Sequence, residues 1–547
     1  MYIEPNTTIK LYSGIPFDNT YEHTLWFDDV TAQNTYFHGG THPGRAKYTL
    51  ANNSYQRVER GKMRIEKCAD DIYDCNYLAF QNTNYGNKWF YAFIISVEYI
   101  NNVTSEIVFE IDVMQTYLFD MTLEECFVER EHSETDEIGD NILPEPIDTS
   151  NVICSFYSQT MNMQKYDLII NVSRYKEGSQ YYNGGMVNGL MQGMTPRRFP
   201  LDGDTPAQTA QNISDILSYL DELIDDNHQD EVISMCMFPT FYTGNYPFYP
   251  AEVTIPDILI PTSFGQGEYE PKNKKLLTFP YSYLDVDSLS DHAVYRYEWF
   301  KEKTNTNGRY VHFLTIGTTS AQPQITLIPQ DYNGDPVGDY NMTEKLVMDD
   351  FPQVGWSADS FKIWAATHGG STAIKTVGGT VSATAGAVGL WTALGAGASA
   401  TGYGAPLVAL IGGILALANV GNEVAVAHSM PAQERGTNSG DIDVATRRKD
   451  FYFRRMQITP QQARVVDDFF SMFGYACNRV KIPNRKARQL WNYVKTKGCN
   501  ILGTAPADDI RKVAKIYDHG ITFWNSPLGF GQYHNADGTL IDNPPVV

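Results

Sequence analysis

Two short stretches carry side chains that could bind a metal ion or move protons. His38 and His42 flank a Gly-Gly-Thr turn, but no cysteine or carboxylate follows at the spacing of a metal site. Residues 129–137 are rich in carboxylates and match a cation site by composition alone. The favoured interpretations are a turn with exposed histidines and a solvated acidic loop. The sequence therefore predicts no metal and no cofactor.

Catalytic motifs are missing from the sequence. No nucleophile elbow, zinc-protease motif, phosphate-binding loop or dinucleotide-binding glycine pattern follows a plausible strand. Cys477 and His519 could in principle pair in a cysteine hydrolase, but nothing around Cys477 favours a thiolate. The seven cysteines are scattered and odd in number, as expected for reduced thiols in a protein made in a cytoplasm. We therefore expect a protein that is not an enzyme.

Basic side chains gather near the C-terminus of a chain that is acidic overall. The formal net charge is −22, which argues against a DNA-coating protein and suits a surface that DNA slides past. No acidic residue lies between Arg479 and Ala507. This interval contains Arg485, Lys486 and Arg488, which could contact a nucleic-acid backbone. Salt bridges to acidic surfaces of this chain or of neighbouring subunits are the favoured interpretation.

The most unusual stretch of the chain carries no charge. Residues 376–422, here called the charge-free segment, contain no Asp, Glu, Lys or Arg in 47 positions, and eleven of these are glycine. The segment divides into residues 381–400 and 403–421, and each half, as a helix, would be about as long as a bilayer core is thick. Small residues recur at close spacing, which lets backbones approach each other in a membrane.

Two interpretations of the charge-free segment stay open. It is either a buried hairpin or loop packed inside an oligomer, or a membrane inserter that is hidden in one state and exposed in another. The two agree if the interior of an oligomer hides the segment. The candidate membrane-inserting residues are Val388, Leu390, Trp391, Leu394, Tyr403, Leu407, Val408, Leu410, Ile411, Ile414, Leu415 and Leu417. The candidate hinge residues between the two halves are Gly402, Gly404 and Pro406.

Strand signals dominate the elements that hold these residues. The 35 tyrosines and 27 phenylalanines, with many Asn, Thr and Gly, favour strands and turns over long helices. We expect strands at 77–80, 89–99, 103–113, 451–458 and 521–524. Helices are expected to begin at Thr205-Pro206 and Thr459-Pro460, where a threonine cap precedes a proline, and to cover 485–495 and 505–519.

Several stretches together resemble one known family. They are residues 16–19 (PFDN) with 25–27 (LWF), 77–99 (YLAFQNTNYGNKWFYAFIISVEY), 109–120 (FEIDVMQTYLFD), 126–132 (CFVEREH) and 499–525. They are similar to the tail knob, or distal tail tube, proteins of small short-tailed phages of the picovirus type, which infect Gram-positive bacteria. The N-terminal part of the resemblance covers about 120 residues.

The resemblance implies a homohexamer at the distal end of the virion tail. It also implies an adjoining tail or collar protein as partner, passage of viral DNA through the lumen, and long apolar loops. These loops would plug the lumen and then insert in the host membrane as a pore. We expect a mainly β fold with some α, made of tube-forming β-barrel domains, an irregular β-rich insertion and a long apolar loop.

The expected parts follow from this family architecture. Residues 1–150 and 425–547 would form the tube domain, 151–363 a distal insertion, and 364–424 the membrane-active apolar loop. Two other functions stay open. A cell-wall-degrading tail-tip enzyme would need a nucleophile or metal site, and a receptor-binding tail protein would adsorb to specific cells by itself.

Overall fold

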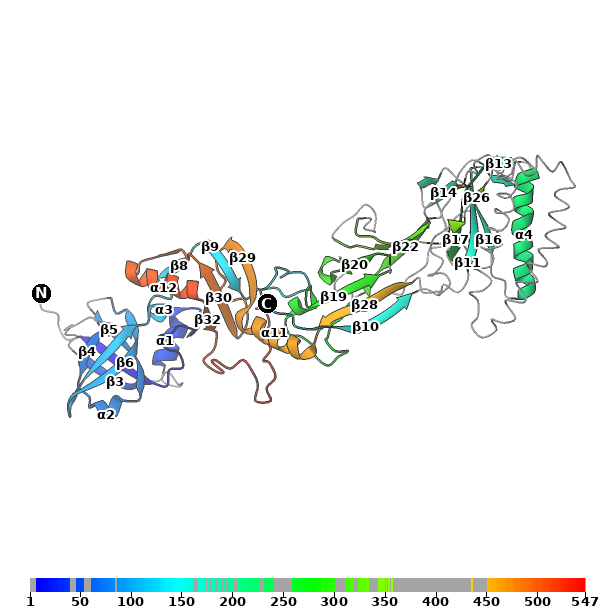
Figure 1. Ribbon diagram of the computed structural model, residues 1–547. Helices are drawn as coiled ribbons and strands as arrows, with labels where there is room; N and C mark the ends of the chain where they lie inside the picture. Colours follow the sequence, from blue (N-terminus) through cyan, green and yellow to red (C-terminus); the bar gives the residue numbers. More distant parts are fainter. Residues whose placement is uncertain are drawn as a thin grey trace. The chain divides into compact units, whose positions relative to one another are not determined.

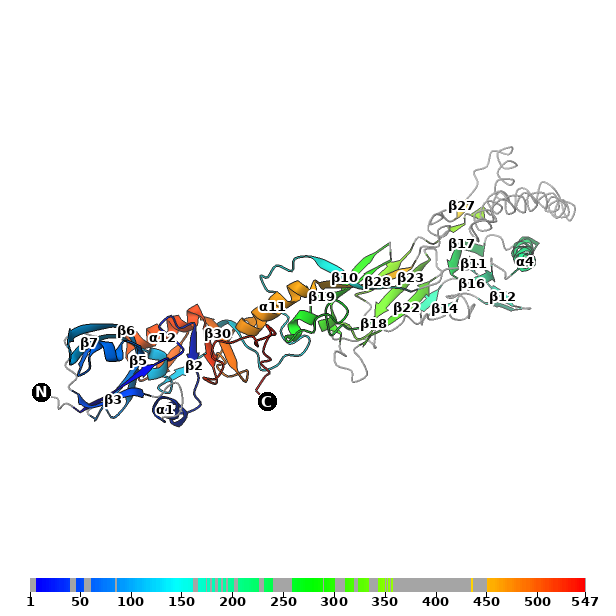
Figure 2. The ribbon, with the colours of Figure 1, turned by 90° about the horizontal axis from the view of Figure 1, so that it is seen from below.

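The structure, a computed structural model, describes most of the chain and divides it into two compact units (Figure 1 and Figure 2). Unit 1 comprises Met1–Asn151, Thr262–Tyr281 and Ile458–Val547, and unit 2 comprises Val152–Pro261 and Ser282–Gln457. The described residues are 6–39, 46–53, 61–83, 86–160, 166–173, 175–177, 180–182, 185–187, 190–192, 195–200, 205–225, 231–239, 258–288, 290–300, 310–318, 323–333, 343–349, 351, 353–354, 356–357, 434–435 and 450–546.

Unit 1 begins with an antiparallel sheet of six strands in the order β3-β1-β5-β6-β7-β4. The strands are β1 (Thr7–Ser13), β3 (Ala46–Asn53), β4 (Lys62–Ile65), β5 (Cys75–Asn82), β6 (Trp89–Asn101) and β7 (Thr104–Ile111). Apolar side chains such as Ile9, Leu11 and Ile107 alternate along the strands and fill one face of the sheet. Irregular pairing of β1 with β3 and of β6 with β7 bends these strands.

The second sheet of unit 1 is built from both ends of the chain. Its five strands run in the order β2-β32-β30-β9-β29, and only the β2–β32 pair is parallel. A separate ladder pairs β8 with β31. The strands are β2 (His23–Leu25), β8 (Met121–Leu123), β9 (Cys126–Glu131), β29 (Tyr475–Lys481), β30 (Trp491–Lys497), β31 (Ile501–Gly503) and β32 (Ile521–Trp524).

Short helices cover these sheets. They are α1 (Val30–His38), α2 (Ala69–Ile72), α3 (Val113–Thr116), η3 (Lys274–Leu277), α11 (Pro460–Phe473) and α12 (Ala507–His519). The side chain of Thr459 caps α11 by accepting from the Gln462 amide, and Pro460 opens the helix. Gly474 ends α11 with φ +65°, and a Cβ there would lie 2.2 Å from the carbonyl oxygen of Glu131. Only glycine therefore lets β29 start so close to β9.

An aromatic core joins the two sheets of unit 1. Tyr77 and Phe93 come from the first sheet, Trp491 and Phe523 come from the second, and Tyr517 comes from α12. All five side chains are buried, with exposed fractions of at most 4%. Large aromatic side chains bury much apolar area, so this core ties the N-terminal and C-terminal segments into one folded body.

Unit 2 is a set of smaller sheets. Four-stranded sheets run β10-β28-β19-β20 and β16-β11-β17-β25, and a three-stranded sheet runs β22-β23-β24. Helix α4 lies beside the β16-β11-β17-β25 sheet in both views (Figure 1 and Figure 2). The larger elements are β10 (Val152–Thr160), β11 (Tyr166–Val172), β16 (Thr195–Pro200), α4 (Pro206–Asp225), β17 (Val232–Pro239), β19 (Ser282–Asp287), β20 (His292–Tyr295), β22 (Phe313–Thr318), β23 (Gln324–Pro329), β24 (Leu346–Met348), β25 (Gln353–Val354) and β28 (Phe451–Ile458).

Short ladders complete unit 2. They pair β12 with β13, β14 with β15, β18 with β21, and β26 with β27. The elements are β12 (Tyr175–Glu177), β13 (Gln180–Tyr182), β14 (Gly185–Val187), β15 (Leu190–Gln192), β18 (Ile258–Leu259), η4 (Tyr297–Trp299), β21 (Tyr310–Val311), β26 (Trp356–Ser357) and β27 (Glu434–Arg435).

The predicted elements are largely confirmed. The fold is mainly β with some α, the five expected strands are present, and helices start at the two Thr-Pro pairs. The helix expected at 485–495 is wrong, because Trp491–Lys497 is the strand β30. Pairing with β9 and β32 and burial of Trp491 and Val494 outweigh the helix propensity of this basic stretch.

The compact units differ from the predicted parts in two places. Residues 262–281 belong to unit 1, although they fall inside the predicted distal insertion. Residues 434–435 and 450–457 fall within unit 2 rather than with the C-terminal tube part. The assignment of 1–150 and 425–547 to a tube, and of 151–363 and 364–424 to an insertion and a loop, stays a prediction.

Candidate functional sites

The charge-free segment lies outside the described residues, and so do all the candidate inserting and hinge residues within it. The described strands that flank it do come together. Trp356 pairs with Arg435 and Ser357 pairs with Glu434, so β26 and β27 form an antiparallel ladder. The neighbouring β25 pairs with β17 of a four-stranded sheet. The residues just before 358 and just after 433 therefore lie side by side in unit 2.

The three basic candidates each have a partner inside unit 1. The Nζ of Lys486 lies 2.6 and 2.8 Å from the two carboxylate oxygens of Asp28. The guanidinium of Arg485 lies 4.6 Å from the ring centroid of Trp26. The side chain of Arg488 is buried, and its Nη2 lies 3.8 Å from Asp136. Contact of Arg485, Lys486 and Arg488 with a neighbouring subunit or a nucleic acid stays a prediction.

The acidic stretch 129–137 is only in part the solvated loop that its composition favours. Glu131 and His132 are buried, with exposed fractions of 2% and 4%. Glu131 forms an ion pair with Lys481 and accepts a hydrogen bond from the Asn484 amide at 3.0 Å. Of the five acids in this stretch, Glu134 and Glu137 are exposed, Glu129 and Asp136 are partly exposed, and Glu131 is buried. The interpretation is wrong for Glu131, because β9 pairs with β29 and β30 at this residue and its carboxylate is buried beside Lys481.

His132 is held as a neutral imidazole. Its Nδ1 accepts from the Tyr493 amide at 2.7 Å, and its Nε2 donates to the Ser471 carbonyl at 3.0 Å. Burial, with Arg488 and Arg130 nearby, lowers the pKa of His132 to about 3. The indole of Trp491 donates to the same Ser471 carbonyl at 2.7 Å. The histidine thus joins β9, β30 and α11.

Glu145 is the centre of a second buried group of charges. Its side chain is fully buried and pairs with Arg130 and with Lys275, whose Nζ lies 2.6 Å from Oε1. The Ala476 amide donates to the same oxygen at 2.8 Å. Burial lowers the pKa of Lys275, while Glu145 acts in the opposite direction. Each buried charge has a partner, which is the condition for tolerating ions in a protein interior.

Asp467 of α11 binds the segment 262–281. One carboxylate oxygen accepts from the Tyr269 hydroxyl at 2.6 Å and from the Lys272 amide at 2.7 Å. The other accepts from the Asn273 amide and side chain, at 3.0 and 2.8 Å. The Tyr475 hydroxyl lies 2.6 Å from Asp136. We call the charged and polar side chains of these contacts the buried charge cluster. Its members are Arg130, Glu131, His132, Asp136, Glu145, Lys275, Asp467, Tyr475, Lys481 and Arg488.

Sequence reasoning missed the buried charge cluster. Its acids and bases come from 130–145, 272–275 and 467–488, which are far apart in the chain. From its composition, each of these stretches is predicted to be an exposed polar surface.

The other candidate chemistry is absent from the described part of the chain. His38 lies against the Trp89 ring and its Nδ1 is 3.0 Å from the Tyr12 hydroxyl, while His42 is outside the described residues. Burial raises the pKa of the Cys477 thiol, which opposes formation of a nucleophilic thiolate. Among the described residues no group of His, Cys, Asp or Glu is placed to hold a metal ion. None of the described helices is long and apolar enough to span a bilayer.

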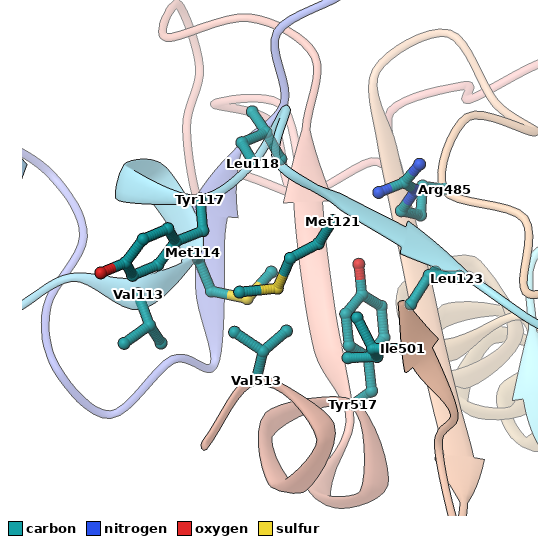
Figure 3. Close-up of a pocket in the computed structure, with 10 residues that line it drawn as sticks. All are labelled: Val113, Met114, Tyr117, Leu118, Met121, Leu123, Arg485, Ile501, Val513 and Tyr517. Atoms are coloured by element: carbon teal, nitrogen blue, oxygen red, sulfur yellow. The ribbon is translucent and has the colours of Figure 1, made fainter. Parts of the chain in front are cut away.

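A small cavity lies among α3, β8, β31 and α12 (Figure 3). Figure 3 shows Met114, Met121 and Val513 around it, with Arg485 at its edge. Its volume of about 20 Å³ has room for a water molecule and not for a substrate. The cavity is therefore too small to be a substrate site.

Comparison with known proteins defines the class of the chain. Residues 5–122, which include the six-stranded sheet, match the N-terminus of the caudoviral major tail protein. With a mainly β fold, this match places the chain among the tail proteins of phages. Residues 253–536, just over half of the chain, match the C-terminal domain of the tail knob protein gp9 of Bacillus phage phi29. The chain belongs to this family of tail knob proteins.

Full-length relatives agree with this membership. The tail knob protein gp9 of Bacillus phage B103 is 25% identical, with 96% of this chain and 97% of that protein covered. The gp9 of phage phi29 is 24% identical, with 95% and 96% covered. The solved tail knob protein gp12 of bacteriophage C1 has a TM-score of 0.57 at 14% identity, covering 98% of this chain and all of its own. The protein is a structural component of a phage tail.

Proposed function

We propose that six copies of the chain form the distal tube of the tail, and that the charge-free segment blocks its lumen before infection. On infection the segment would enter the host membrane and open a path for the viral DNA. One observation carries the proposal, the presence of 47 consecutive uncharged residues in a chain of net charge −22. Membership in the tail knob family supports it.

The ring follows from the need to hide these residues. A monomer that exposed so large an apolar segment would aggregate, whereas the interior of a ring shields one segment per copy. We assign residues 1–150 and 425–547 to the tube wall, 151–363 to a distal insertion and 364–424 to the loop. The adjoining tail or collar protein would seat the ring, and synthesis would take place in the host cytoplasm.

The paired strands β26 and β27 suit such a loop. They join the chain before residue 358 to the chain after residue 433, so a change in the loop need not disturb the rest of unit 2. Glycine carries a high ordering cost, so a loop with eleven glycines would rest weakly in a lumen. In lipid a helix satisfies its backbone hydrogen bonds internally, and burial of Leu407, Ile411 and Leu415 is favourable.

Dye release from liposomes tests the membrane step. One variant replaces residues 376–422 by a short Gly/Ser linker between Lys375 and Glu423, and a second carries Ile411→Asp. Aspartate at a bilayer centre costs about 2.5–3.5 kcal/mol per helix, multiplied across the ring. The matched control is Ile411→Leu. We expect wild type and the control to release dye, and both test variants to release far less.

Native mass spectrometry tests the ring and separates the outcomes. We expect six copies for wild type and for the linker variant. A linker variant that assembles and releases dye like wild type would rule out the membrane role. A linker variant that fails to fold would make the segment part of the core. Compact monomers of wild type at micromolar concentration would argue against the ring itself.

A further inference from the structure

Two cysteine thiols meet inside unit 1. Cys126 is the first residue of β9, and Cys499 lies in the turn between β30 and β31. Both are free thiols, and they lie close enough for each to influence the pKa of the other. Cys126 is buried and Cys499 is partly exposed. They come from segments more than 370 positions apart in the chain.

The backbone around both cysteines is held firmly. The Cys499 amide donates to Asp518 of α12 at 3.1 Å, and the Glu124 amide donates to the Asn500 carbonyl at 2.9 Å. The β8–β31 and β9–β30 ladders run on either side of the pair. Between them Gly498 has φ +68°, a conformation that favours glycine, and it ends β30 just before Cys499.

We propose that Cys126 and Cys499 form a disulfide when the protein passes from a reducing cell interior to an oxidising medium. Phe127 pairs with Lys497 and Leu123 pairs with Ile501, so each cysteine lies between the same two ladder contacts, which bring their backbones together. A disulfide needs Cα atoms about 4.4–6.8 Å apart. The oxidant is a low-molecular-weight disulfide such as oxidised glutathione. One cysteine thiolate attacks it and releases one glutathione thiolate, and the second cysteine then displaces the other glutathione. The cysteine pair loses two electrons and two protons, and the oxidant becomes two thiols.

The bond would close the chain into one covalent loop. This loop contains unit 2 and the charge-free segment, and both of its ends are fixed in unit 1. A crosslink between such distant residues restricts the unfolded chain strongly. We expect the oxidised protein to unfold at a temperature roughly 5–10 °C above the reduced one. The inference does not depend on the ring or on membrane insertion.

The surroundings set the rate of the reaction. Burial raises the pKa of the Cys126 thiol, and burial with the neighbouring Cys126 thiol raises the pKa of Cys499 to about 12. The negative charge of Asp518 also raises the pKa of both thiols, and that of Glu131 raises the pKa of Cys126. Since the thiolate is the nucleophile, oxidation should be slow near neutrality and about tenfold faster per added pH unit.

Peptide mapping tests the proposal on the full-length protein. The protein is incubated with oxidised glutathione at about pH 8, alkylated, and digested without reduction. We expect one crosslinked peptide pair, Cys126 with Cys499, two hydrogens lighter than the reduced peptides. Cys126→Ser and Cys499→Ser each abolish this link, and Cys154→Ser, which removes an exposed cysteine of unit 2, keeps it.

Unfolding under reducing conditions keeps the test decisive. Each serine variant should have an unfolding temperature close to that of the reduced wild type. The absence of the crosslink in a variant then cannot be attributed to misfolding. If Cys154 is glutathionylated while Cys126 and Cys499 remain separately alkylated, the proposal is wrong. Mixed glutathione adducts on the pair, or links between chains in place of the Cys126–Cys499 link, also overturn it.

Discussion

The buried charge cluster and the charge-free segment use charge in opposite ways. In the cluster Glu145, Arg130 and Lys275 are buried together, and each has a charged partner. Such pairs tolerate little displacement, because an ion without its partner in a protein interior is strongly destabilised. The charge-free segment has no ion that needs a particular partner. Charge fixes the first region in one arrangement, whereas the second contains no charge whose burial would be costly.

The largest effect is expected from a change at Glu145, the centre of the buried ion pairs. Glu145→Ala leaves Arg130 and Lys275 buried without their carboxylate and removes the acceptor of the Ala476 amide. We expect the free energy of local opening of β29 and β30 to fall by about 3–5 kcal/mol. Hydrogen exchange with mass spectrometry on peptides from these strands measures it. Asp74→Ala, which removes the exposed Lys47–Asp74 pair, is the control and should change nothing measurable.

Acid should weaken the cluster through His132. Its pKa is about 3 in the folded protein and about 6.5 in the unfolded chain, so the unfolded chain binds more protons between these values. The stability that this histidine contributes is present above about pH 6.5 and is lost as the pH falls. Denaturant unfolding should show a loss of about 3 kcal/mol between about pH 6.5 and pH 4. His132→Gln should show a shallower acid slope, and an unchanged slope would contradict the assignment.

Asp112 should show the opposite dependence. Its carboxylate caps α3 by accepting from the Met114 and Gln115 amides at 3.0 and 3.1 Å, and it accepts from the Tyr77 hydroxyl at 2.9 Å. Burial raises the pKa of Asp112 to about 6. The folded protein therefore binds more protons than the unfolded chain between about pH 4 and pH 6, and stability falls as the pH rises through this window.

Asp112→Asn isolates this contribution. The amide keeps an acceptor for the helix cap and has no charge to bury. Relative to the variant, wild type should lose roughly 2–3 kcal/mol between about pH 4 and pH 7. Parallel denaturant unfolding of the two proteins at both pH values gives the difference. A constant difference would mean that Asp112 does not titrate in this window.

The sequence predicts the local parts of the fold and misses the contacts between distant segments. Alternating aromatic and β-branched residues predict β5, β6 and β7, and Thr459-Pro460 predicts the start of α11, because these signals lie within a few residues. The ladder of β26 and β27 joins positions nearly 80 residues apart, and no local pattern indicates it. The burial of Glu131 is missed for the same reason, because composition alone predicts a solvated acidic loop at 129–137. Asp467 and Asn273 are polar residues whose burial depends on the fold around them.

The smallest effect is expected at the exposed end of the basic interval. The Lys486–Asp28 pair is largely exposed, so Lys486→Ala should change stability by at most about 0.5 kcal/mol. The double change Arg485→Ala with Lys486→Ala tests the predicted contact with nucleic acid. Asp28 already neutralises Lys486, and Arg485 lies on Trp26.

A path that held the phosphates with basic side chains would slow the DNA, whereas an acidic or neutral path lets it slide. We therefore expect weak DNA binding that the double variant leaves unchanged in a titration across salt concentrations. Tight, salt-sensitive binding that the double variant loses would place Arg485 and Lys486 on the DNA path. The basic residues beside the buried charge cluster would then have a role in DNA passage as well as in stability.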